Sequence, residues 1–295
     1  MNPGGHHLTS GKIALRLWLA LVCATVSIHP AARARQRAAQ EDSQSPSDRP
    51  FTSASKTAPP PAAAIILPSG TVLPVRLNAS VSSAKNKVRQ IVTGRIMQDI
   101  PLPDGSKIRE GAVVEGHIVE VIRGNRATGA RVSIQFDTLR SSRQAIPIST
   151  SLRAIAGPME VAQAQTPRSG PGESDVFDWS DTVQIGGDAV YGLGGPVTAA
   201  NDSSLVVGKR VASGVLSQVR AKEGTKCRGA IDGNQSPQAL WVFSSDACGT
   251  YGIEHLHIAH AGRTVPVGVI VLSFDSGTLK IRSGTAMLLR VGTAK

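Results

Sequence analysis

Residues 71–81, TVLPVRLNASV, carry an apolar side chain at almost every second position. Leu73, Val75 and Leu77 fall on one side of this pattern, and Arg76 falls on the other. Successive side chains of a β-strand point to opposite faces, so a period of two predicts a half-buried strand. Pro74 lacks an amide hydrogen, which favours a position at the edge of a sheet.

The sequence that follows repeats this pattern. Short runs with β periodicity recur at 91–100, 113–122, 131–139 and 145–149. The reversal Pro-Asp-Gly at 103–105 and a Gly-rich loop at 123–129 separate them. Because no ten-residue helical pattern intervenes, residues 64–156 predict a small β-barrel or β-sandwich domain.

The C-terminal part of the chain has the same character. Strands are expected at 238–245, 253–260, 265–274, 278–282 and 286–291, and Asp-Ser-Gly at 275–277 predicts a hairpin turn. Only 205–222 allows a helix. The fold class is therefore all-β, with two small barrel or sandwich domains, 64–156 and 175–295, joined by a linker at 157–174.

The N-terminal region reads as an export signal. Lys12 and Arg16 precede an apolar run of 12 residues at 17–28, and the site Ala32-Arg33-Ala34, with a small residue on each side of Arg33, follows. This order predicts a signal peptide over 1–34, and a run of this length is too short to span a membrane. Residues 35–63 are rich in Pro, Ser and Ala and predict a disordered spacer. We therefore expect an exported protein, periplasmic or extracellular, without a transmembrane helix in the mature chain.

The charge of the chain is strongly basic. Removal of 1–34 lowers the formal net charge from +11 to +8, because three basic and no acidic residues leave. Basic residues are concentrated in the first half of the chain, and these are Lys85, Lys87, Arg89, Arg123, Arg126, Arg131, Arg140 and Arg143. The first six are the candidates for an anion-binding surface. They favour an anionic partner such as an envelope polymer, and the alternative is a solubilising surface. Aromatic residues make up only 3% of the chain, which argues against nucleic acid as the partner.

Two cysteines remain after the signal segment is removed. Cys23 leaves with it, so Cys227 and Cys248 are expected to form a disulfide in an oxidising compartment. The alternative is a catalytic thiol, which needs a reduced partner and a nearby histidine.

One segment is a candidate for metal binding. In residues 254–260, EHLHIAH, a strand would project His255 and His257 to the same face, where two imidazoles can share one ion. The alternative is an amphipathic strand with two solvated histidines. The chain contains no Gly-x-Ser-x-Gly elbow and no His-Glu-x-x-His motif, so no catalytic residue and no cofactor is assigned.

Part of the chain resembles a known family. The strings GTVLPVRLNASVSS, VTGRIMQDIPLPDGSKIREGAVVEGHIVEV and ARVSIQFDTL resemble the C-terminal β-barrel of TrbI-type proteins in conjugation and type IV secretion core complexes. The resemblance covers 64–156 and implies a β-barrel and a place in such an assembly. The whole chain also resembles a set of exported bacterial proteins, in segments such as QIGGDAVYGLGGPV and ALWVFSSDACGTYG.

These observations favour an exported, non-enzymatic β protein of the cell envelope with a binding, assembly or structural role. Its expected partners are an anionic envelope polymer or other envelope proteins. Two alternatives stay open, a metal-dependent enzyme that uses His255 and His257, and an accessory component of a secretion or conjugation assembly.

Overall fold

A computed structural model of the chain describes residues 65, 67–142, 144–167, 180–192, 194–220 and 235–293. All of them belong to one compact unit, Pro60–Lys295. The expected all-β class is confirmed, since the described residues form 20 strands and one short helix, α1 (Pro158–Ala164). The expected signal peptide, 1–34, and the expected spacer, 35–63, lie outside the described residues.

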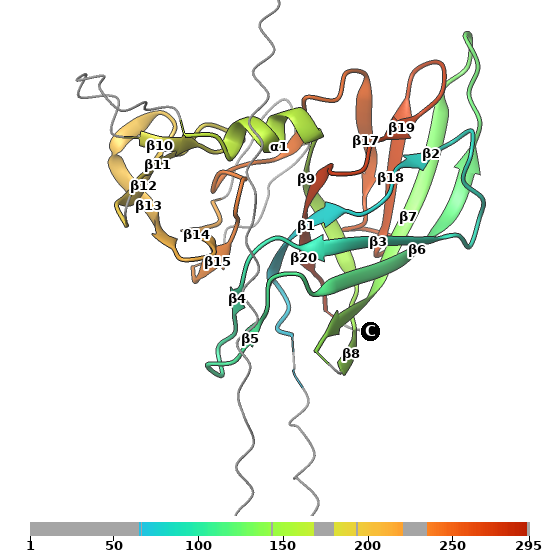
Figure 1. Cartoon of the computed structure of the whole chain (residues 1–295). Helices are drawn as coiled ribbons and strands as arrows, with labels where there is room; N and C mark the ends of the chain where they lie inside the picture. Colours follow the sequence, from blue (N-terminus) through green and yellow to red (C-terminus); the bar gives the residue numbers. More distant parts are fainter. Residues whose placement is uncertain are drawn as a thin grey trace, which may run out of the picture. The chain divides into compact units, whose positions relative to one another are not determined.

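The largest sheet has ten strands (Figure 1). In pairing order they are β16 (Gly249–Tyr251), β9 (Thr150–Ala156), β20 (Ala286–Val291), β1 (Val72–Leu77), β3 (Ile91–Ile96), β6 (Val113–Ile122), β7 (Ala130–Ser141), β18 (Val269–Phe274) and β17 (Leu256–Ala261), and β8 (Gln144–Pro147) pairs with β7. All neighbours are antiparallel except β16 and β9. Among the described residues, the end strands β16 and β17 do not pair with each other, so the sheet is not a closed barrel.

This sheet takes strands from both ends of the described chain. β20 lies between β1 and β9, with Leu73 opposite Leu289 and Ile155 opposite Met287. β18 extends the other side of the sheet, with Ile270 opposite Ile134. The expected division into domains at 64–156 and 175–295 therefore does not describe the strand pairing. Periodicity identifies a strand but carries no information about which distant strand it pairs with. Here strands from 64–156 pair with strands from 175–295, and the two ranges share one sheet.

A second, six-stranded sheet lies within the interval between β9 and β16. Its strands, in chain order, are β10 (Ser180–Val183), β11 (Ala189–Tyr191), β12 (Pro196–Ala199), β13 (Asp202–Val211), β14 (Gly214–Gln218) and β15 (Pro237–Ala239). Each pairs antiparallel with the next. The expected helix at 205–222 is wrong, because residues 205–218 of this segment belong to the β13–β14 hairpin. Gly214, with a φ of 142°, follows the turn and supplies a backbone conformation that most side chains disfavour.

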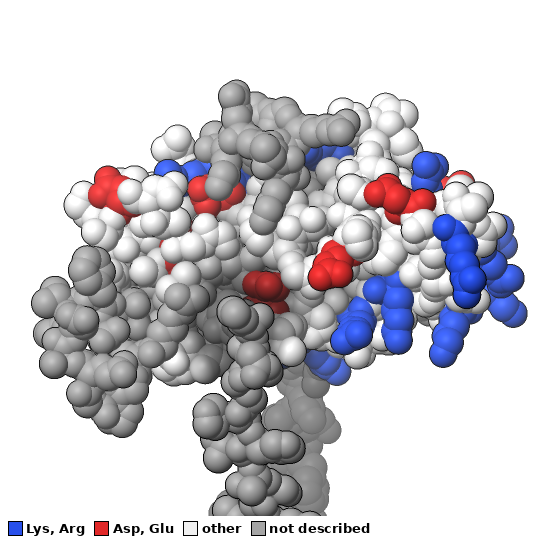
Figure 2. Space-filling model, turned by 90° about the horizontal axis from the view of Figure 1, so that it is seen from above, with Lys and Arg blue, Asp and Glu red and all other residues white. Residues whose placement is uncertain are grey.

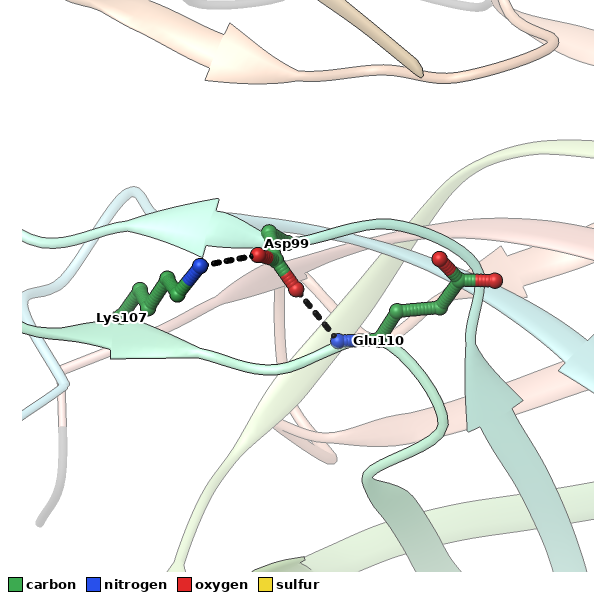
Figure 3. Close-up of polar contacts among 3 residues, drawn as sticks. All are labelled: Asp99, Lys107 and Glu110. Carbon is green, nitrogen blue, oxygen red and sulfur yellow. Dashed lines mark hydrogen bonds and ion pairs between the residues drawn. The ribbon is translucent and has the colours of Figure 1, made fainter. Parts of the chain in front are cut away.

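Two small two-stranded sheets complete the fold. β2 (Val81–Ser82) pairs with β19 (Lys280–Ile281), and β4 (Ile100–Pro101) pairs with β5 (Lys107–Ile108). Asp99 fixes the second pair (Figure 3), because its Oδ2 accepts a hydrogen bond from Lys107 Nζ at 2.5 Å and its Oδ1 accepts one from the Glu110 amide at 2.9 Å.

Two buried clusters connect these elements. The main core contains fully buried side chains from the large sheet, among them Leu73, Ile134 and Phe136. The second cluster joins α1 and the 240–247 segment, including Phe243, to Leu288 of the large sheet. A hydrogen bond also links the β3–β4 connection to the inserted sheet, since the buried Gln98 Nε2 donates to the Val215 carbonyl oxygen of β14 at 2.9 Å. The inserted sheet is thereby packed onto the large one.

Candidate anion-binding surface

Three connections meet at one end of the large sheet, and we call this region the basic end. It comprises residues 83–91, 118–131 and 273–282. The Gly277 amide donates to the Asn125 carbonyl oxygen at 2.6 Å, and the Ser83 amide donates to the Leu279 carbonyl oxygen at 3.0 Å. The Arg89 amide donates to the carbonyl oxygen of Ile118 at 2.7 Å. Segments almost 200 residues apart are thus held side by side.

The local sequence explains why these connections adopt their shapes. Asn125 Oδ1 accepts hydrogen bonds from the amides of Ala127 and Thr128 at 2.8 and 2.9 Å, which folds the β6–β7 loop on itself. A Cβ at Gly124 would lie 2.2 Å from the Gly277 carbonyl oxygen, so only glycine permits the close approach of the two loops.

The basic end concentrates positive charge. It carries eight basic residues, and these are Lys85, Lys87, Arg89, Arg123, Arg126, Arg131, Lys280 and Arg282. All eight are exposed. Figure 2 shows Lys and Arg side chains gathered at the right of the view, where Figure 1 places β2 and β19.

Only two acidic residues share this region, and both are engaged elsewhere. Asp275 Oδ2 lies 2.9 Å from His257 Nε2, and Glu120 Oε2 accepts a hydrogen bond from Ser133 Oγ at 3.2 Å. Within the described part of the chain, none of the eight basic side chains forms an ion pair. Their charges are therefore available to an external anion.

Of the eight basic residues that the sequence singled out, Arg143 lies outside the described residues, and Arg140 lies at the other end of β7, where it forms an ion pair with Glu115. The structure brings the other six together. They come from two connections, 83–91 and 118–131, that pack against the same end of the sheet. Sequence reasoning missed Lys280 and Arg282, which β19 brings to this end by pairing with β2, with Lys280 opposite Ser82. Their distance along the chain from Lys85 gave no local indication of this proximity.

Arg89 has an unusual backbone conformation within this surface. Its φ is 68°, in the left-handed region where glycine or asparagine is the usual residue. Its side chain is exposed and its amide is fixed by Ile118. A basic residue thus occupies a position that the backbone alone would assign to a smaller one.

The histidine segment does not have the expected geometry. β17 begins at Leu256, and His255 precedes it in a turn with a φ of 57°. The expectation that His255 and His257 share one face of a strand is therefore wrong, because the period of two was counted through a turn. His260 does not join His257 in an ion site either, since its Nδ1 lies 2.8 Å from the Val269 carbonyl oxygen and its Nε2 lies 3.0 Å from Thr264 Oγ1. Across the described ranges, no group of three or more His, Cys, Asp or Glu side chains could hold a metal ion.

The expected disulfide concerns one described residue. Cys248 is buried, with 3% of its surface exposed, and its amide donates to the Tyr251 hydroxyl at 3.1 Å. Cys227 lies outside the described residues, so the bond between them stays a prediction.

A cavity of about 290 Å³ lies between α1, β10 and the β13–β14 turn. Its lining includes Glu110, Gln184, Arg210 and Trp241. One carboxylate and one guanidinium thus line it, in contrast to the single sign of charge at the basic end.

In the part of the chain that the structure describes, no helix is long and apolar enough to cross a membrane.

Comparisons of this chain with models of protein families, with curated proteins and with solved structures found no match. The resemblance of 64–156 to TrbI-type barrels therefore stays a prediction.

Proposed function

We propose that this protein is an exported, non-enzymatic binding module that attaches to polyanions of the cell envelope through the basic end. One observation carries the proposal: three connections from distant parts of the chain bring eight exposed basic side chains together without an ion-pair partner among the described residues. Like charges repel one another, and a bound polyanion relieves that repulsion.

Export is the second part of this proposal. It rests on the basic and apolar order of residues 12–28 and on the small residues Ala32 and Ala34 that follow. An envelope location supplies the polyanions that such a surface would meet, and an oxidising compartment suits the proposed bond between Cys227 and Cys248. We do not propose a metal-dependent enzyme, since His255 lies in a turn and does not share a strand face with His257.

A charge-reversal pair tests the binding proposal. Lys87→Glu with Arg126→Glu removes charge from the basic end, and Arg109→Glu with Lys209→Glu changes the net charge equally at two exposed residues elsewhere. At roughly 1 kcal/mol for each basic side chain near an anionic surface, the first pair should weaken binding to immobilised polyphosphate by at least about tenfold. Binding should also weaken as salt rises, because exposed charges are screened. Biolayer interferometry measures both effects.

The control pair decides how the result is interpreted. If Arg109→Glu with Lys209→Glu weakens binding as much as the first pair, net charge alone governs binding and the basic end is not a site. If the wild-type chain does not bind polyphosphate at low salt, the proposal is wrong.

A second candidate function, accessory component of a secretion or conjugation assembly, rests on the resemblance of 64–156 alone. Stable co-purification with components of a secretion core complex would support it, and a monomer that binds none of them would argue against it.

A further inference from the structure

Aliphatic side chains are exposed among the charges of the basic end. Val88, Ile91, Val119 and Ile122 have exposed fractions of 54%, 71%, 36% and 42%. They account for four of the nine large hydrophobic residues that are exposed in the described part of the chain. Such a concentration is unusual, because exposed aliphatic groups are unfavourable in water unless a partner covers them.

The aliphatic and basic side chains are neighbours. Val88 lies between Lys87 and Arg89 in the sequence. Ile122 is opposite Arg131 in the β6–β7 register, and the hydrogen bond from the Arg89 amide to Ile118 brings the 88–91 segment beside Val119. A surface that meets the basic end therefore meets both kinds of side chain at once.

This combination distinguishes a lipid surface from a hydrated polymer. A soluble polyanion needs only cations and gains nothing from aliphatic groups. At the interface of an anionic bilayer, Lys and Arg contact headgroup phosphates while aliphatic side chains enter the acyl boundary. The flexible stems of Lys and Arg let charged ends and apolar neighbours lie at different depths.

We propose that the polyanion bound by the basic end is the surface of an anionic phospholipid bilayer, to which the protein attaches peripherally. This inference rests on the proposed function, because it assigns a partner to the same surface. Attachment to the bilayer uses the basic side chains to attract the anionic headgroups and the four aliphatic side chains to insert into the acyl boundary.

Vesicle sedimentation with the full chain tests the inference. We expect binding to vesicles of phosphatidylcholine with phosphatidylglycerol and little binding to phosphatidylcholine alone. Val88→Ser with Ile91→Ser should weaken vesicle binding by about fivefold or more, since two aliphatic groups no longer enter the interface. The same variant should bind polyphosphate as wild type does. The matched control, Leu205→Ser with Val206→Ser, changes two aliphatic residues of β13 that are exposed by 44% and 59% and should leave vesicle binding unchanged.

The outcomes separate this inference from the proposed function. Binding to polyphosphate without binding to anionic vesicles overturns the bilayer assignment and leaves the polyanion module intact. Equal vesicle binding by wild type and by Val88→Ser with Ile91→Ser also overturns the assignment. Binding to neither probe overturns both proposals.

Discussion

At the scale of single residues, a buried guanidinium connects distant parts of the chain. Arg153 of β9 is 6% exposed, and its Nε donates to the Ala247 carbonyl oxygen at 2.9 Å. Its Nη2 donates to the carbonyl oxygens of Arg220 and Ser245 at 2.6 and 3.3 Å. Desolvation lowers the pKa of Arg153 to about 10, and the charge of Asp246 opposes this shift. The side chain therefore stays charged at neutral pH and ties the inserted segment to β9.

Replacing this residue should destabilise the whole fold. Arg153→Met keeps much of the side-chain volume but removes the donor to the carbonyl oxygens of Ala247 and Arg220, while the Ser245 carbonyl oxygen still accepts from the Arg220 amide. Loss of such hydrogen bonds should lower the free energy of unfolding by about 2–4 kcal/mol. Urea denaturation measures the change, with Arg109→Met at an exposed position as the control. Equal stability of the two variants would contradict this role of Arg153.

At the scale of elements, the β4–β5 hairpin depends on the ionised carboxylate of Asp99 (Figure 3). The hydrogen bond from Lys107, and then that from the Glu110 amide, lowers the pKa of Asp99 below its ordinary value of 3.8. When the pKa of a carboxyl is lower in the folded state than in the unfolded state, the group stabilises the folded protein at pH values above the unfolded-state pKa. That contribution is lost as the pH falls through the lower, folded value.

Asp99→Asn should therefore lower stability at neutral pH and reduce the loss of stability between about pH 5 and pH 2. The effect should stay under about 1 kcal/mol, because the side chains of Lys107 and Asp99 are 49% and 30% exposed and solvent screens their attraction. Thermal unfolding across this pH range measures it. Glu110→Gln is the matched control, since only the backbone of Glu110 contacts Asp99. If the stability of Asp99→Asn depends on pH as that of the wild type does, the Asp99 carboxylate does not stabilise the β4–β5 hairpin in this way.

At the scale of the whole molecule, the C-terminal strands complete the sheet that the earlier strands begin. Without them, β1 loses β20, β7 loses β18, and β9 loses both β20 and β16. Three strands of 64–156 would then present unpaired backbone groups and an uncovered core.

A chain limited to residues 64–156 should therefore not fold cooperatively, whereas a chain of residues 60–295 should. Circular dichroism during thermal unfolding and the dispersion of amide resonances measure the difference. A cooperative transition of 64–156 alone would show that two independent domains exist after all.

The sequence determined several features through local chemistry. Its period of two located the strands closely, with 113–122 and 286–291 matching β6 and β20. It also identified the six basic residues of two connections that the structure brings together. Boundaries were poorer where turns interrupt the pattern, as at His255. They were also poorer at 238–245, because the strand there, β15, is Pro237–Ala239 and ends early in the expected range.

Only the tertiary structure decided which strands pair. Pro74 predicted an edge, yet β1 lies between β20 and β3. The Pro74 carbonyl oxygen accepts a hydrogen bond from the Met97 amide at 2.9 Å. The Pro74 nitrogen faces the same neighbouring strand, β3. The pairing of β1 with β3 ends at Val75 and Ile96, so no amide hydrogen is needed from Pro74. Likewise, Lys280 and Arg282 joined the basic end, and four aliphatic residues became exposed beside it, through contacts between segments far apart in the chain. Local patterns express the preferences of neighbouring residues, whereas pairing and exposure depend on which distant surfaces the folded chain brings together.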